Sequence, residues 1–310
     1  MRFRTTIVVA LVLLAACGDD DDASTPDTSS STTAPTDEAV DAATLCADAV
    51  AAEDVVTVAN PDLSEASGLA ASRQNDGVLW THNDSGGEAE VYALGLDGAD
   101  LGSVRLEGVE AVDWEDMAAG PDQLYLGDIG DNDAQRDSVV VYRIAEPEVP
   151  PAGIGAITTT DVERLTLTYA DGPHDAETLL ADPLTGDLFV VTKQWDGTAS
   201  GVYRIPADAP PGDTPVVMER VGDVSGVDGQ MVTAGDVAAD GSLVALRTYA
   251  GVLVWDREDG QSVADALEGE PCEAPAPFEL QGEALAFTPD GRGYVTVPEG
   301  EAPRLSRFHL

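Results

Sequence analysis

Five segments of the chain repeat one pattern: a short run of small and apolar residues, a turn rich in glycine, aspartate or proline, and a second apolar run. They start at residues 65, 113, 175, 233 and 281 and read EASGLAASRQNDGVLWTHND, DWEDMAAGPDQLYLGDIGDN, DAETLLADPLTGDLFVVTKQ, TAGDVAADGSLVALRTYAG and QGEALAFTPDGRGYVTVPEG. The pattern is typical of antiparallel β-hairpins. No long run with a helical period follows residue 60, which excludes a helical repeat protein.

Further apolar runs extend each hairpin. The first three hairpins are followed by a third run and a fourth, the fourth hairpin by a clear third run (GVLVW), and the last unit ends with PRLSRFHL. Four antiparallel strands per unit, repeated radially, predict an all-β fold, a β-propeller of five four-stranded blades. A six-bladed ring is the alternative if an irregular stretch hides strands. The apolar run Asp54–Ala59 would supply the strand that the last unit lacks and so close the ring.

The N-terminus has the order of a bacterial export signal. Arg2 and Arg4 precede a short apolar run, TIVVALVLLAA, which ends in LAAC at Leu14–Cys17. This resembles the lipobox of bacterial lipoproteins, in which the cysteine carries the lipid. We therefore expect residues 1–16 to be a signal peptide, Cys17 to be lipidated, and the protein to be anchored on the extracytoplasmic face of the cell membrane.

The segment that follows is polar and acidic. Residues 17–52 are rich in Ser, Thr, Asp, Ala and Pro and have few large apolar side chains, so we expect a disordered tether. The folded domain is then predicted at residues 53–310. Cys46 and Cys272 are the cysteines left once Cys17 is lipidated. An exported chain permits disulfides, and both would lie near the last blade, which favours a Cys46–Cys272 bridge over two free thiols.

The charge balance restricts the partners. The chain has 58 acidic and 15 basic residues, a net charge of −43, and Lys193 is its only lysine. Such a surface repels nucleic acid and anionic lipid headgroups, so we expect neither as a partner of the folded part. Apolar residues make up 43% of the chain, enough for a sizeable core. We expect a monomer with a solvated acidic coat.

Acidic side chains recur where hairpins begin and end. In a propeller the first strand of each blade lines the channel and the second runs back, so its end meets the start of the first at one mouth. Carboxylate oxygens there suit calcium or another divalent cation, for which we single out Glu115, Asp116, Asp128, Glu177 and Glu283. The candidates for holding a ligand are His82, Asn83, Lys193, Arg247 and Glu299.

A structural interpretation competes with this one. The same residues can form turns and a hydrogen-bonded ring that ties the blades together, and Lys193 can form a salt bridge with Glu177 or Asp175. We predict no organic cofactor. No G-x-S-x-G, H-E-x-x-H or Walker motif is present in the sequence.

The motifs SGLAAS, LWTHNDSGG, VDWEDMAAG, LYLGDIGDN, DAETLLADPLTGDLFVVTK and GEALAFTPDGRGYVTV together resemble an uncharacterised family of secreted bacterial WD40-like propeller proteins. The resemblance covers about residues 60–310 and implies the fold and export, but no reaction. The chain is also loosely similar to the esterase-like propellers that are related to phytases and to gluconolactonases. This similarity lies in the architecture and in the GEAL type of blade start. That similarity implies acidic residues on the channel around calcium or another divalent ion.

Two classes of function follow. The first is a binding module that holds a small-molecule or protein ligand, with a divalent cation, at one mouth of the channel. The second is a metal-assisted hydrolase of an ester, lactone or phosphoester, in which Glu115, Glu177 or His174 would transfer protons. A metal site open to water favours the enzyme, and a closed one favours the binding module.

Overall fold

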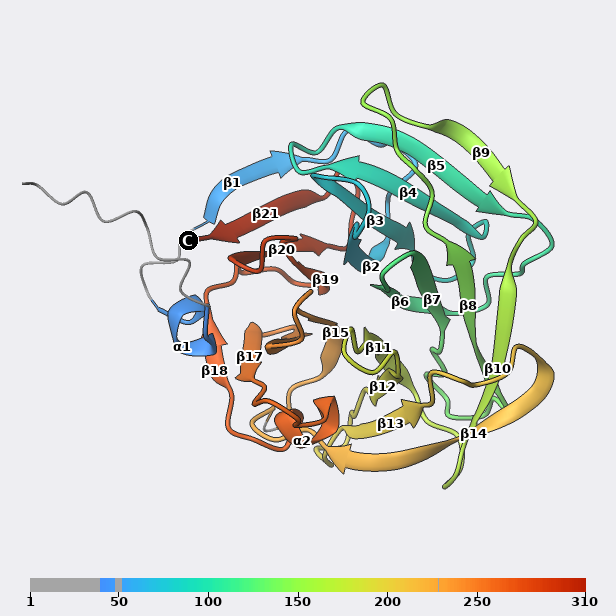
Figure 1. Ribbon diagram of the computed structural model, residues 1–310, viewed down its shortest axis with the longest axis vertical. Coiled ribbons are helices and arrows are strands. Elements are labelled where there is room, and N and C mark those ends of the chain that lie inside the picture. The colour runs from blue at the N-terminus through green and yellow to red at the C-terminus, as the bar shows by residue number, and fades with distance from the viewer. Residues whose placement is uncertain (1–39, 48–51, 228) are drawn as a thin grey trace, which may run out of the picture. The chain divides into compact units, whose positions relative to one another are not determined.

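The computed structural model describes residues 40–47, 52–227 and 229–310. In this part of the chain, twisted antiparallel sheets stand around a central axis with their first strands innermost (Figure 1). The fold is therefore an all-β propeller, as the hairpin repeats predict. The expected signal peptide, the lipidated Cys17 and most of the expected tether lie outside the described residues.

All five expected hairpins are present. The inner strands are β2 (Ala66–Ala71), β6 (Trp114–Ala119), β11 (Ala176–Ala181), β15 (Val232–Val237) and β19 (Gly282–Phe287). Each pairs with the strand that follows it: β3 (Val78–Asn83), β7 (Gln123–Asp128), β12 (Leu188–Thr192), β16 (Leu243–Thr248) and β20 (Gly293–Pro298).

The third and outer strands complete the sheets. The third strands are β4 (Glu90–Gly95), β8 (Val139–Ala145), β13 (Gly201–Ile205), β17 (Val252–Asp256) and β21 (Arg304–His309). The outer strands are β5 (Asp100–Leu106), β10 (Glu163–Tyr169), β14 (Gly212–Asp223), the short β18 (Cys272–Ala274) and β1 (Ala52–Thr57). A short helix, α2 (Val263–Leu267), precedes β18.

The outer strands depart from isolated four-stranded units in two places. β10 and β14 pair in parallel, which joins two hairpin units into one eight-stranded sheet. A further strand, β9 (Gly155–Thr159), pairs in parallel with β5 and gives the first unit a fifth strand. Glycine permits this pairing, because a Cβ on Gly102 would lie 2.2 Å from the carbonyl oxygen of Gly155.

The ring closes between the two ends of the folded part. β1 pairs antiparallel with β21, with Val56 opposite Leu305, so the segment before the first hairpin completes the last sheet. This is the closure that the Asp54–Ala59 run predicts. Figure 1 shows β1 lying along β21 at the rim.

The folded part begins earlier than the predicted residue 53. Helix α1 (Ala42–Leu45), inside the segment expected to be a disordered tether, buries Ala42 and Leu45 against the core beside β17. The expected disulfide is present, joining Cys46 to Cys272 with Cα atoms 6.0 Å apart. It attaches α1 to the outer strand β18. In the chain-entropy model, a bridge over so long a loop stabilises the fold by about 4–5 kcal/mol.

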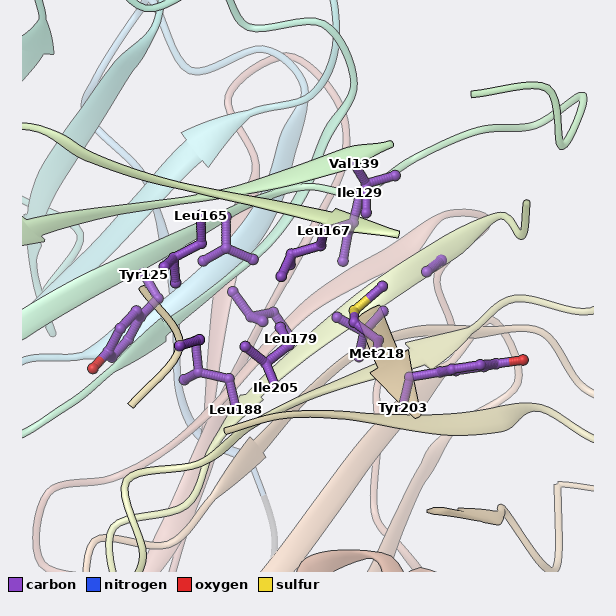
Figure 2. Close-up of a cluster of buried hydrophobic side chains, with 14 of the residues drawn as sticks. Tyr125, Ile129, Val139, Leu165, Leu167, Leu179, Leu188, Tyr203, Ile205 and Met218 are labelled. Atoms are coloured by element: carbon purple, nitrogen blue, oxygen red, sulfur yellow. The ribbon is translucent and has the colours of Figure 1, made fainter. Parts of the chain in front are cut away.

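The core consists of apolar clusters between neighbouring sheets. Each inner strand contacts the next around the ring, β2 to β6, β6 to β11, β11 to β15, β15 to β19 and β19 to β2. All residues of these strands are buried, because a sheet covers each of their faces. Figure 2 shows one cluster, in which Leu165 and Leu167 of β10 face Leu188 and Ile205 of the next unit. Burying one such side chain contributes roughly 1.5–3 kcal/mol.

Among the described residues, no helix has the length and apolar character needed to cross a membrane.

The closure gives a first prediction. A chain lacking residues 1–59 loses β1, α1 and the disulfide, so β21 keeps an unpaired edge and we expect the domain to unfold or to melt far below the full chain. The matched control is the full chain with Cys46→Ser and Cys272→Ser, which loses only the bridge and should stay folded at reduced stability. Thermal melts followed by circular dichroism compare the two. Equal melting temperatures for truncated and double-serine proteins would contradict a structural role for β1.

Candidate functional site

Each inner strand departs from regular pairing at its second residue. In β6, for example, Trp114 pairs with Asp128 and Asp116 with Gly127, which leaves Glu115 without a partner. A bulge of this kind re-aims the side chain of the extra residue. The first extra residues of the five strands are Ser67, Glu115, Glu177, Thr233 and Glu283. Three glutamates therefore take equivalent places at one end of the channel.

The two hydroxyl residues at this position tie neighbouring inner strands. The Ser67 hydroxyl donates to the backbone oxygen of Glu115 at 2.5 Å, and the Thr233 hydroxyl donates to that of Gly282 at 2.7 Å. The glutamates do not make this contact, so their carboxylates are left for the mouth.

A cavity of about 220 Å³ opens at this end of the channel. Its walls include all three bulge glutamates and the residues that directly follow four of the second strands. These are Asp84 after β3, Lys193 after β12, Tyr249 after β16 and Glu299 after β20. We call this space the mouth cavity. Five of the predicted site residues thus line it together: Glu115, Glu177, Lys193, Glu283 and Glu299.

Carboxylates crowd around Glu115. Asp84, Asp113 and Glu115 each place a side-chain oxygen within 4.8 Å of the others, and so do Glu115, Asp175 and Glu177. Glu115 belongs to both groups and is only 5% exposed. Two groups of three hard oxygen donors that share one residue are an arrangement that can hold a divalent cation.

The hydrogen bonds leave oxygens of this cluster free. In the described part of the chain, no N–H or O–H group donates to the Glu115 carboxylate, although it is buried. Asp175 accepts one hydrogen bond, from the Asp131 N–H at 2.9 Å, and its Oδ2 atom is buried without a partner. A fully buried acceptor such as Oδ2 of Asp175 is costly unless something else satisfies it.

Gly130 makes room for the cluster. A Cβ at this position would lie 2.1 Å from Oε1 of Glu115 and 2.6 Å from Oδ2 of Asp113. Any side chain at residue 130 would therefore displace both carboxylates.

Burial in a group of like charges keeps protons on these acids. Desolvation, together with neighbours such as Glu177, raises the pKa of Glu115 well above its usual value. Burial and then Asp84 raise the pKa of Asp113 to about 6. Burial raises the pKa of Glu283 to about 7, against the opposing effect of Lys193. The mouth cavity therefore holds carboxyl groups that titrate near neutral pH.

Lys193 lies in a buried ion pair with Glu177. Its Nζ atom also donates to the Tyr249 hydroxyl at 3.1 Å and lies 5.1 Å from the centre of the Trp195 ring. Burial opposes the charge of Lys193, but Glu177 outweighs it and raises the pKa of the ammonium group. The structure thus contains the Lys193–Glu177 salt bridge that the structural interpretation of the sequence expected.

Asp116, expected among the metal ligands, does not line the mouth cavity. Its fully buried carboxylate accepts the backbone N–H groups of Met117, Leu179 and Gly235, at 2.8, 3.0 and 3.3 Å. Leu179 and Gly235 belong to the inner strands β11 and β15, so Asp116 ties three inner strands together. The prediction of a cross-linking ring is the one that fits this residue.

Asp128 has a similar structural role. It accepts the Val112 and Asp113 N–H groups and forms a 2.7 Å ion pair with Arg136. It lies at the end of β7 and is not among the residues that line the mouth cavity.

His82 and Asn83 are also placed away from the mouth cavity. Both lie inside β3, so the strand pairing fixes them. His82 has no exposed surface, its ring lies edge-on to Trp114, and burial lowers its pKa to about 4. Asn83 accepts the N–H groups of Ser64 and Glu65 and so holds the turn before β2.

Arg247 and His174 also have partners outside the mouth cavity. Arg247 is 1% exposed inside β16 and forms a 2.8 Å ion pair with Glu279. His174 lies in the loop before β11, where its Nε2 atom is 3.0 Å from Asp171 and 2.9 Å from the Tyr203 hydroxyl. Neither residue is among those that line the mouth cavity.

Asp113 and Asp175 were not among the predicted site residues. Each stands two residues before a bulge glutamate, in the sequences DWE and DAE. This repeated D-x-E spacing is the signal in the sequence that marks both residues.

Comparisons with known proteins show only distant likenesses. No family model matches the chain, and no curated protein matches its sequence. Solved structures similar to it include the PQQ-bound aldose sugar dehydrogenase from Streptomyces coelicolor (15% identity, 84% of this chain and 99% of that one, TM-score 0.46). Another is a protein assigned as a gluconolactonase (14% identity, 86% of this chain and 95% of that one, TM-score 0.47). A third is a chain of the mitotic checkpoint complex (12% identity, 84% of this chain and 95% of that one, TM-score 0.43). At these TM-scores the likenesses carry no argument about ligand or reaction, and the fold rests on the sheet topology.

The raised pKa values predict an unusual pH dependence of stability. The folded form holds the Glu283 proton up to a pKa of about 7, whereas the unfolded chain releases it near 4.5. The folded state therefore binds more protons between these values, and stability should fall as pH rises from 4.5 to about 7. Glu283→Gln should have a shallower fall in Tm over this range, measured with a chelator present. Exposed Glu107→Gln is the control, and equal slopes for both variants would contradict the assignment.

Proposed function

We propose that the protein binds a divalent cation, and through it a small ligand, at the mouth cavity. The observation that carries this proposal is Glu115, a buried carboxylate that accepts no hydrogen bond from the described residues and lies at the meeting point of two carboxylate groups. A cation would supply the missing partner and offset the repulsion.

Calcium suits the donor set best. It takes six to eight oxygen ligands in a flexible geometry, whereas magnesium demands a regular octahedron. Asp84, Asp113, Glu115 and Asp175 are the residues that would hold it. Glu177 also belongs to the cluster, but its carboxylate is already paired with Lys193.

The rest of the mouth cavity would select the ligand. Its volume of about 220 Å³ is below that of a drug-sized pocket, so it suits a ligand of few atoms. Lys193 and Tyr249 present donors to it, and Trp195 stands at the rim with 62% of its surface exposed. A small ligand with oxygen atoms would contact both the cation and these donors.

Calcium should therefore raise the melting temperature at fixed ionic strength. Binding to the folded state alone stabilises it by about 2.7 kcal/mol at a hundredfold excess over the dissociation constant. Glu115→Gln should remove most of this shift and Glu107→Gln should keep it. Differential scanning calorimetry with calcium, magnesium and sodium makes the comparison. A wild-type shift no larger with calcium than with magnesium or sodium would leave only a structural role for the cluster.

Metal-assisted hydrolysis is the second candidate, favoured by one observation. Glu283 lines the same cavity as the carboxylate cluster, and its pKa of about 7 suits general acid–base catalysis at neutral pH. Calcium-dependent cleavage of a simple ester or lactone, lost in Glu283→Gln while the calcium-induced rise in Tm persists, would support it. Calcium binding without any such cleavage would favour the binding module.

The remaining proposals concern architecture and location. We count the propeller as five-bladed, supported by the closed ring of inner strands, with β1 completing the last blade. We also propose a monomer that Cys17 anchors by lipid to the extracytoplasmic face of the membrane, supported by the LAAC motif after a short apolar run. A Cys17→Ser protein should leave the membrane fraction, and retention equal to wild type would refute the anchor.

A further inference from the structure

The other end of the channel carries a second cavity, of about 320 Å³. The mouth cavity lies at the starts of the inner strands, whereas this one lies at their ends. Ala119 and Ala181 are the last residues of β6 and β11, and Arg73 and Ala239 follow β2 and β15 by two residues each. The two cavities share no lining residue.

Arg73 lines this cavity and makes few of the hydrogen bonds that its guanidinium group could donate. Its side chain is 13% exposed, yet the structure gives it one hydrogen bond, from Nη2 to the backbone oxygen of Val237 at 3.1 Å. Its Nη1 atom is buried and has no acceptor among the described residues. A guanidinium group has five N–H donors, so this Arg73 is short of partners.

The nearest acid does not meet that need. Asp236 forms an ion pair with Arg73 at 3.9 Å, but this distance is beyond that of a hydrogen bond. Both oxygens of Asp236 already accept backbone N–H groups, from Val237 and Phe287 at 2.8 Å each. The acid that lines the cavity, Asp182, is held by two hydrogen bonds from Arg257, at 2.7 and 2.9 Å.

The rest of the lining is largely apolar. Pro121, Pro183, Leu188 and the ring of Tyr125 surround the space beside Arg73. A ligand that fits would therefore have an apolar body and one group that accepts hydrogen bonds from a guanidinium.

We propose that this second cavity binds a small monocarboxylate with an apolar body. A planar carboxylate matches the fork of a guanidinium. A single negative charge is favoured because the chain carries a net charge of −43, which repels multivalent anions such as phosphate or sulfate. The proposal does not depend on the cation site at the opposite mouth.

Benzoate is the probe that tests the proposal, and benzamide is the matched uncharged compound. Isothermal titration of the full chain should give a dissociation constant on the order of 1 mM or tighter for benzoate, and at least about tenfold weaker binding for benzamide. Sulfate should not compete. A chelator should leave benzoate binding unchanged, which separates this site from the cation site.

Two variants locate the binding. Arg73→Gln should weaken benzoate binding at least about tenfold, with exposed Arg164→Gln as the control. Because Arg73 also contacts the channel, Ala239→Phe is the second variant: it fills the cavity from its exposed rim, leaves Arg73 in place, and should abolish binding while the melting temperature is kept. Equal binding of benzoate and benzamide, or wild-type binding by folded Arg73→Gln and Ala239→Phe, would overturn the proposal.

Discussion

Five inner strands share one narrow axis, and the crowding there determines most of this structure. Only small residues fit in places, since a Cβ on Gly68 of β2 would lie 2.7 Å from the backbone nitrogen of Met117 on the neighbouring inner strand β6. Backbone groups that face the channel find partners in the carboxylates of Asp116 and Asp236, which accept N–H groups from neighbouring inner strands. The ring is thus held at its centre by hydrogen bonds as well as by apolar packing between the sheets.

The bulges at the starts of the inner strands place side chains at the mouth cavity. Each one releases a residue from the pairing pattern, and in three strands that residue is a glutamate. Glu115 lies beside Asp113, and both Glu115 and Glu177 lie beside Asp175, while Lys193 forms an ion pair with Glu177. Burying so many acids beside one base is unfavourable for the folded state unless protons or a cation neutralise them. For this reason burial and the neighbouring carboxylates raise the pKa values of Glu115 and Glu283.

The sequence predicts the architecture well because the fold is a repeat. Hairpin spacing is a local property, so the inner hairpins, the closing pair of β1 with β21 and the Cys46–Cys272 bridge follow from it. The parallel contacts of β9 with β5 and of β14 with β10 do not, because they lie outside the repeated hairpin pattern and depend on close approaches such as that of Gly102 to Gly155.

The site is predictable only in part, for a related reason. Glutamates at strand starts are found from the repeats, but which side chain faces the mouth depends on bulges and on the last paired residue of each second strand. Residues directly after those strands, such as Lys193 and Glu299, reach the mouth cavity, whereas His82 and Arg247, inside the strands, are held by pairing. Two positions along the chain thus separate a buried structural group such as Arg247 from a cavity-lining residue such as Tyr249.

In the proposed cation site, the mouth carboxyl groups hold protons that a cation displaces. Calcium titration by calorimetry at about pH 6, in two buffers of different ionisation enthalpy, measures the protons released on binding. We expect calcium binding to release protons at pH 6. The number of protons released should fall as the pH approaches about 8, because Glu283 and Asp113 are then ionised before the cation binds. Calcium binding with no proton release at pH 6, or no binding at all, would contradict this expectation.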